Sequence, residues 1–215
     1  MYNINSMNIF SNLNTSELRV FQRLNSPAKI QDYLETIPIN FERNGQTCYS
    51  PRQVLKFNRA HCMEGAMLAA TILYFHGHKP LIVDLRAHKR DRDHAIAVFK
   101  VGGKWGAISK TNHAVLRYRE PIYNSIRELV MSYFHEYFLD NGKKTLRSYS
   151  LPVDLSKFDS KNWITSPQDL WYIDKYLNQV HHIPILNKKQ IASLRSADRI
   201  EIQAGKLTAQ KKNQN

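Results

Sequence analysis

The pair of residues best suited to nucleophilic chemistry in this chain is Cys62 and His94. Cys62 begins a long apolar run that ends at Phe75, which predicts a buried helix. His94 begins a second apolar run, which predicts a buried strand. The positive end of a helix dipole favours a thiolate, and an imidazole packed beside it can take the thiol proton. The sequence therefore predicts Cys62 as a nucleophile and His94 as its base.

Helices on either side of the cysteine are predicted from their start signals. Three Ser-Pro pairs place a capping hydroxyl before a proline at the first helical position; they predict helices over 27–36, 51–57 and 167–180. The cysteine helix itself is predicted over 60–75, ending before Gly77. It is apolar on nearly all sides, so we expect it to be buried, and its small residues allow close approach to a sheet.

Strands are predicted over 80–85, 94–101 and 104–109, the last two joined by Gly102-Gly103 in a type I′ hairpin. Both hairpin strands lack alternation, so both faces should be covered. A two-residue loop places Thr111 opposite His94, and puts Ser109 on the same face, diagonal to His94 and about 5.5 Å away. Asn112 points the other way unless a bulge intervenes.

The remaining pattern completes an α+β fold. Apolar spacing predicts an amphipathic helix over 126–138, and 145–153 looks extended. We expect one domain over residues 1–203, with its core at about 50–120 and helical additions on either side. Residues 204–215 are polar and basic without a period, which predicts a flexible tail.

Residues 58–109 resemble the transglutaminase-like superfamily of papain-like cysteine enzymes. The resemblance depends on the cysteine helix with its start at Ala60-His61-Cys62-Met63-Glu64, a helix end at Gly77 followed by a strand, His94 at the next strand, and Trp105 in the return strand. The stretches 105–112 and 116–121 are also similar to a group of bacterial proteins that carry this domain. That second resemblance spans most of the chain but implies no activity.

The superfamily resemblance implies that Cys62 attacks an amide or peptide substrate, a protein included, and forms a thioester. It also implies that His94 acts first as base and then as acid, with no cofactor. The backbone N–H groups near Cys62 would hold the oxyanion, with Trp105 or Gln53 as further candidates for the site wall. The fold implied is a cysteine-bearing helix packed on an antiparallel sheet, with additional helices at both ends.

The third member of the site departs from the superfamily pattern. An aspartate usually follows the tryptophan by four residues, and here that place is Ser109. A serine hydroxyl can accept a hydrogen bond from an imidazole, but it brings no charge to stabilise an imidazolium. Asn112 is an alternative third member if a bulge turns it inward. Asp84 and Asp93 carry the right charge, although Asp93 points away from the face of His94.

Other interpretations of the same residues stay open. The chain could be a non-catalytic binding or scaffold module, which Ser109 favours. Glu64 in the first helical turn has the charge that suits the helix dipole. Cys48 is expected to be a free thiol without a role. The histidines match no usual zinc spacing, so no metal site is expected.

The composition of the chain limits the kinds of partner that we expect. The net charge is +13, and residues 187–215 contain seven Lys or Arg and two acids, so most of the excess is spread over the chain. A dispersed basic surface without an aromatic RNA-binding motif disfavours nucleic acid. The N-terminus lacks the pattern of a signal peptide and no apolar run is long enough to span a bilayer. We therefore expect a cytoplasmic protein, of undetermined oligomeric state, that does not enter membranes.

Overall fold

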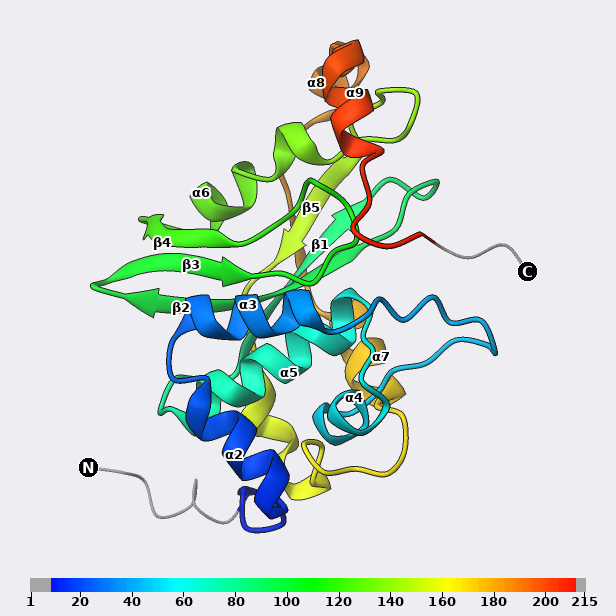
Figure 1. The fold of residues 1–215 in the computed structure, drawn as a ribbon. Coiled ribbons are helices and arrows are strands. Elements are labelled where there is room, and N and C mark those ends of the chain that lie inside the picture. The colour runs from blue at the N-terminus through cyan, green and yellow to red at the C-terminus, as the bar shows by residue number, and fades with distance from the viewer. Residues whose placement is uncertain (1–8, 212–215) are drawn as a thin grey trace.

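The computed structural model of this chain describes residues 9–211. Within them, one antiparallel sheet has the strand order β4-β3-β2-β1-β5-β7, and β6 pairs with β1 (Figure 1). The strands are β1 (Leu81–Ala87), β2 (His94–Val101), β3 (Lys104–Ile108), β4 (Arg119–Tyr123), β5 (Leu146–Ser150), β6 (Val153–Asp154) and β7 (His182–Pro184). The fold is therefore α+β with an antiparallel sheet, in agreement with the fold class expected from the sequence.

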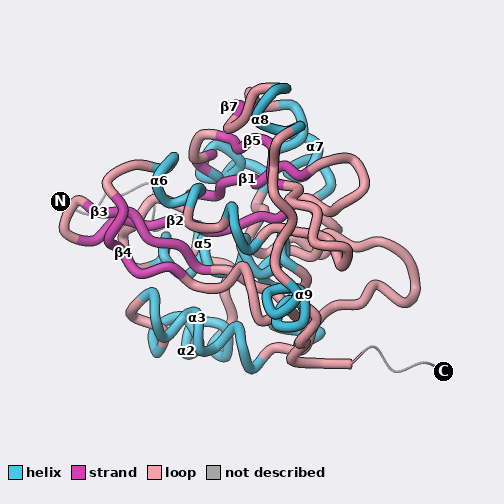
Figure 2. The backbone as a smooth tube through the Cα atoms, turned by 90° about the horizontal axis from the view of Figure 1, so that it is seen from above, coloured by secondary structure: helices cyan, strands magenta, loops and turns pink. Residues whose placement is uncertain are grey.

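Helices cover both faces of this sheet. The α-helices are α2 (Thr15–Arg23), α3 (Pro27–Thr36), α4 (Pro51–Phe57), α5 (Cys62–Phe75), α6 (Ile126–Met131), α7 (Trp171–Gln179), α8 (Lys188–Ala192) and α9 (Arg199–Gly205). Two short 3₁₀ helices are η1 (Phe134–Glu136) and η2 (Leu155–Lys161). Figures 1 and 2 show α5 and α3 on one side of the sheet and α6 on the other.

The core consists of two apolar clusters separated by the sheet. On the α5 side, Met67 and Leu68 of the helix cluster with Ile82 of β1. On the α6 side, Val83 of β1 and Ile96 of β2 pack with Val130. Successive strand residues thus point to opposite buried layers, as alternation requires. The prediction that both faces of the hairpin would be covered is confirmed.

The hairpin has the predicted register. Val101 pairs with Lys104 and Ala97 with Ile108, which is the pairing of a two-residue loop. Gly102 and Gly103 have φ angles of 56° and 79°. Both angles are positive, as a type I′ turn requires, and glycine adopts them without steric cost. β3 ends at Ile108, so Ser109 lies just beyond the ladder and needs other contacts to fix its position.

Two predicted helices are wrong in extent. Ser166-Pro167 does not start a helix; α7 begins at Trp171 without a side-chain cap. The intervening residues are instead tied to the segment before α4, because Leu170 N–H donates to the Cys48 carbonyl oxygen at 2.7 Å. The amphipathic pattern over 126–138 produces α6 followed by η1, since the α-helix stops at Met131.

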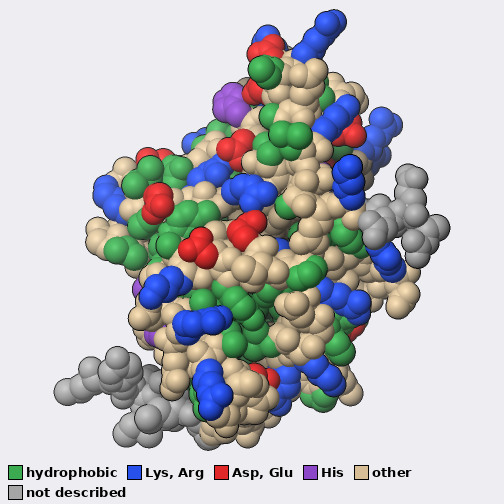
Figure 3. Space-filling view, viewed as in Figure 1, with side chains coloured by type: hydrophobic (Ala, Val, Ile, Leu, Met, Phe, Trp, Pro, Cys, Tyr) green, Lys and Arg blue, Asp and Glu red, His purple; other side chains and the backbone are tan. Residues whose placement is uncertain are grey.

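The segment expected to be a flexible tail is ordered as far as the structure describes it. α9 continues to Gly205, and Ala209 N–H donates to the Asn112 carbonyl oxygen at 2.8 Å. Residues 212–215 lie outside the described part. In residues 9–211, no helix combines the length and apolar character that crossing a bilayer needs. On the face in Figure 3, Lys and Arg side chains are scattered among acidic and apolar ones.

Candidate active site

The nucleophile candidate begins its helix as the sequence predicted. Cys62 is the first residue of α5 and His61 is the N-cap, with an extended backbone conformation. The backbone N–H of Cys62 has no acceptor one turn earlier within the helix, because the first N–H groups of any helix lack one. Cys62 is partly exposed, whereas Cys48, the second free thiol, is buried. Of the two cysteines, Cys62 is therefore the more accessible.

His94 and Ser109 come together as predicted. Nε2 of the buried His94 lies 2.8 Å from Oγ of Ser109. The same hydroxyl donates to the carbonyl oxygen of Leu116 at 2.5 Å. Because a hydroxyl has one proton, Oγ must accept from Nε2–H of the imidazole. This hydrogen-bond chain assigns the tautomer in which Nδ1 carries the lone pair, so Nδ1 is the nitrogen free to act as a base.

The position of Ser109 is fixed by Gln31, a buried side chain of α3. The Gln31 amide accepts from Ser109 N–H at 2.9 Å and donates to the Ser109 carbonyl at 2.9 Å. The side chain thereby supplies the pair of bonds that a neighbouring strand would supply if β3 continued. Both bonds are buried, so leaving either group unpaired would cost about 1–3 kcal/mol. Gln31 consequently holds the hydroxyl in register with the imidazole.

Leu116 adopts an unusual backbone conformation at the end of this chain of bonds. Its φ angle is 60°, in the left-handed region that non-glycine residues seldom occupy. The Leu116 N–H donates to Oε2 of Glu136 at 2.8 Å, while its carbonyl accepts from Ser109. Glu136 is in turn 2.7 Å from a guanidinium nitrogen of Arg119. The strained residue is thus held from both sides and directs its carbonyl at Ser109.

A second imidazole stands beside the thiol. His61 N–H donates to Oε2 of Glu64 at 2.9 Å, and Nε2 of its ring lies 3.0 Å from the Thr47 carbonyl and 3.4 Å from Oε1 of Glu64. Burial opposes a charge on His61, but the contact with Cys62 and the Glu64 carboxylate overcome it and raise the pKa of His61 to about 9. The raised pKa favours a proton on the ring, and Nδ1 of the same ring is the capping acceptor for Met63 N–H at 3.3 Å whenever it is unprotonated.

Glu64 is the anion beneath that imidazole. It is fully buried and accepts from the Tyr49 N–H at 3.0 Å, the Thr47 hydroxyl at 2.7 Å and the Asn40 amide at 3.1 Å, in addition to His61 N–H. A carboxylate with this many donors is well satisfied. Glu64 therefore joins the segment before α4 to the start of α5, in addition to carrying the charge that suits the helix dipole, as the sequence suggested.

The two histidines set the state of the sulfur. Burial raises the pKa of Cys62, but its interactions with His61 and then His94 lower that pKa well below the usual range. For Cys48 the opposite holds, because burial and nearby acids raise the pKa of its thiol.

Three predicted site residues lie elsewhere. Trp105 pairs with Lys100 near the hairpin turn, six positions along β2 from His94, which is roughly 20 Å of strand. Both ends of the Gln53 amide are used in the capping box of α4 and in a bond to the Pro167 carbonyl. Asn112 binds the backbone of Gln210 rather than the imidazole. In the described residues, none of the three is hydrogen-bonded to Cys62 or His94.

The acidic alternatives for the third member are also occupied. Asp84 lies 2.8 Å from Nε2 of His182, and burial raises the pKa of this aspartate to about 6. Asp93 accepts from Ala87 N–H at 2.7 Å. Neither carboxylate bonds to His94, whereas Ser109 does.

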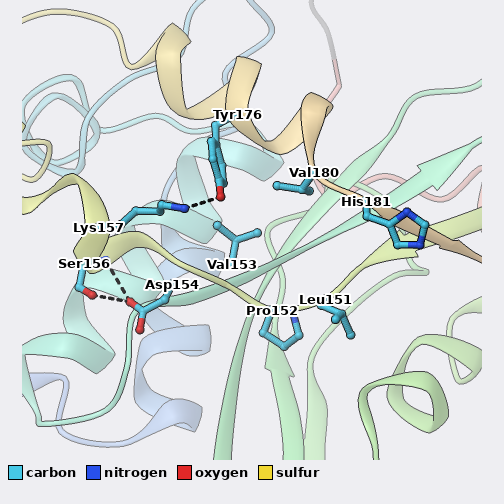
Figure 4. Close-up of a pocket in the computed structure, with 9 residues that line it drawn as sticks. All are labelled: Leu151, Pro152, Val153, Asp154, Ser156, Lys157, Tyr176, Val180 and His181. Atoms are coloured by element: carbon cyan, nitrogen blue, oxygen red, sulfur yellow. Dashed lines mark hydrogen bonds between the residues drawn. The ribbon is translucent and has the colours of Figure 1, made fainter.

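At least two cavities occur in the described part of the chain. One, of about 530 Å³, lies between the segment 151–157 and α7; in Figure 4, Lys157 points across it to the hydroxyl of Tyr176. The other, of about 630 Å³, lies between the segment 38–49, Arg59 and residues 210–211. Cys62 and His94 line neither cavity. In the described residues, no three His, Cys, Asp or Glu side chains converge as metal ligands would.

The sequence pattern missed the supporting residues. Gln31, Leu116 and Glu136 act through the backbone or through another side chain, and no local spacing reveals that. His61 did have a signal, since it precedes the nucleophile and stands three residues before an acid, as N-cap residues often do.

Comparisons with known proteins do not add a name to this site. No model of a protein family matches the chain, and no curated protein matches it either. The assignment of chemistry therefore depends on the geometry of Cys62, His94 and their neighbours.

Proposed function

We propose that this protein is a cysteine-dependent enzyme of transglutaminase-like type, which cleaves an amide or peptide bond or transfers its acyl group through a thioester. Cys62 is the nucleophile and His94 the base. The observation that carries the proposal is the chain of hydrogen bonds from His94 through Ser109 to Leu116, which orients one ring nitrogen for proton transfer.

The reaction follows from this arrangement. With the thiol proton on Nδ1 of His94, the Cys62 thiolate forms a bond to the substrate carbonyl carbon as the C=O π bond opens to an oxyanion. The C–N bond then breaks as His94 returns this proton to the leaving amine. Water or a second amine attacks the thioester, giving its proton to His94, and the C–S bond breaks to restore the thiol. The N–H of Cys62 is available to the oxyanion, since it lacks a helical acceptor.

The neutral third member is compatible with this chemistry. A hydroxyl whose proton is engaged by Leu116 can accept from Nε2–H in both the neutral and the charged ring. The thiolate form of Cys62 is instead favoured by the contacts of the sulfur with His61 and His94, and the Glu64 carboxylate lies 3.4 Å from the His61 ring. Thiolate formation therefore depends less on the third member than in a triad with a carboxylate.

Thiol labelling tests the proposal directly. The native chain is treated with iodoacetamide at pH 6, and each cysteine is followed by mass spectrometry. We expect Cys62 to react at least a hundredfold faster than Cys48, and Cys62→Ala to remove the fast phase. The Cys48→Ala variant is the matched control and should keep it. Equal and slow labelling of both thiols would refute the proposal.

The alternative function is a non-catalytic binding module that has kept this fold. Ser109 favours it, because a hydroxyl stabilises an imidazolium less than a carboxylate does. The two functions differ in turnover: a fluorogenic amide library should give burst kinetics with the native chain and none with Cys62→Ala. Fast labelling without turnover on any amide would favour the binding module.

A further inference from the structure

The C-terminal segment lies on the loop 111–114 as a short extra strand. Ala209 N–H donates to the Asn112 carbonyl at 2.8 Å, and Ala114 N–H donates to the Leu207 carbonyl at 3.0 Å. Between these bonds, His113 and Thr208 form an antiparallel bridge. In Figure 1 the red segment after α9 runs back from that helix along the molecule. The docked residues 207–209 are exposed, so their side chains contribute little to the attachment.

The side chain of Asn112 recognises the backbone of the docked segment. Its amide donates to the Gln210 carbonyl at 2.9 Å and accepts from the Gln210 N–H at 2.9 Å. These paired bonds select an extended main chain and not a particular side chain. One contact does depend on the identity of a side chain, because Ile39 N–H donates to Oε1 of Gln210 at 2.8 Å.

The residues that bind the C-terminal segment lie beside the cavity lined by residues 38–49, because Ile39 and Gln210 both line it. Gln210, Lys211 and Thr47 all line this cavity. The Thr47 carbonyl accepts from the His61 ring, which touches the nucleophile candidate. A peptide bound where residues 207–210 lie would therefore end beside the cavity whose Thr47 contacts the ring next to Cys62. Four backbone-directed bonds, with exposed side chains, are typical of peptide binding by strand addition.

We propose that the strip formed by residues 112–114 with Ile39 is a docking site for an extended peptide of another chain, with a side-chain oxygen at the position of Gln210, and that residues 207–210 occupy this site in the free protein. The proposal concerns binding and does not depend on catalysis by Cys62. An incoming peptide must displace the C-terminal segment, whose backbone bonds it would reproduce.

Binding in trans tests this competition. A fluorescein-labelled peptide of residues 203–215 is titrated by anisotropy into the full chain carrying Cys62→Ala, so that no chemistry can occur. In the chain, Ala209→Pro removes the N–H that bonds to Asn112 and frees the strip. Thr208→Pro is the matched control, because the Thr208 N–H makes no bond in the bridge. We expect the Ala209→Pro chain to bind the peptide at least tenfold more tightly than the Thr208→Pro chain.

Two further arms identify the strip as the site. Adding Asn112→Ala to the Ala209→Pro chain should abolish binding, and a peptide with Gln210→Ala should bind several-fold more weakly. In the unmodified chain, the Ala209 amide should exchange hydrogen more slowly than the Thr208 amide. Equal affinity of the two proline variants, unchanged binding after Asn112→Ala, or an unprotected Ala209 amide would each overturn the proposal. Slow labelling of Cys62 would contradict the proposed enzyme function but not this docking site.

Discussion

Ser109 accepts a hydrogen bond from Nε2 of His94 over 2.8 Å and donates its own proton away from the ring. The serine is therefore a link between the imidazole and a main-chain carbonyl. This differs from a carboxylate, which would end the chain of bonds with a charge. The consequences of the difference can be measured.

Substitution of Ser109 should separate hydrogen bonding from charge. Ser109→Ala removes the acceptor for His94 and should lower turnover about a hundredfold, within the range of general-base effects. Ser109→Asp should not restore the rate, because the Leu116 carbonyl stands 2.5 Å from the present Oγ and would face a second acceptor. Turnover and thermal unfolding of both variants are the measurements. A faster Ser109→Asp enzyme would show that the Leu116 bond has no role.

The pH dependence of labelling should distinguish the two histidines. Because the pKa of Cys62 is lowered by both rings, thiolate persists below the usual pKa and labelling should fall little between pH 8 and 6. His61→Gln should raise that pKa and slow labelling at pH 6 about tenfold, with recovery at high pH. His94→Gln should raise it as well, but it should also abolish amide turnover at every pH. If turnover survived His94→Gln, His61 and not His94 would be the base.

Glu64 should be important for stability. Glu64→Gln leaves donors from Thr47, Tyr49 and His61 facing an amide that can accept with only one oxygen, so we expect a loss of about 2–4 kcal/mol. Glu42→Gln is the matched control, since Glu42 is a partly exposed carboxylate 3.9 Å from the same ring; its loss should stay below about 1 kcal/mol. Urea unfolding at pH 7 measures both. Equal losses would refute a structural role for the buried carboxylate.

Lys110 should make stability depend on pH. Its ammonium donates to the Leu34 carbonyl at 2.7 Å, and its stem occupies the space beside Gly65, where an added Cβ would lie 2.4 Å from the lysine Cβ. Burial lowers the pKa of Lys110 to about 8. Between pH 8 and the unfolded value near 10.5, the unfolded chain holds more protons, so stability should rise with pH.

The Lys110→Met variant isolates the part of this rise in stability that comes from the lysine. The difference between the folded and unfolded pKa of Lys110 corresponds to about 3 kcal/mol of unfolding free energy if the lysine alone titrates. The difference in unfolding free energy between the native chain and Lys110→Met should change in the native chain's favour from pH 8 to 10. A difference that is constant over this range would mean that the lysine is not desolvated in the native state.

The sequence predicted the elements that carry their own local signals. The type I′ hairpin, the start of the cysteine helix and the pairing of His94 with Ser109 follow from turn chemistry, capping and strand alternation. Ser166-Pro167 misled because the same residues that start helices also form turns, and here Ser166 accepts from Gln168 N–H instead.

The supporting part of the site could not be predicted from spacing. Gln31 reaches Ser109 from a helix far earlier in the chain, and the contact exists only because α3 packs beside β3. Trp105 was expected near the imidazole from the resemblance, and Asn112 from a possible bulge after Ser109. The hairpin register places Trp105 opposite Lys100, toward the other end of β2 from His94. Tertiary packing decided the contacts of Gln31 and Asn112.

Leu116 gives the site a property that an acid would not. Its contribution is a peptide oxygen, which gains no proton in the pH range where proteins fold, so the alignment of His94 does not vary with acidity. Nor can a mutation delete that oxygen, since every amino acid supplies one. Changes at position 116 can act on the alignment only by altering the left-handed turn or the packing of the Leu116 side chain against the apolar cluster on the α6 side.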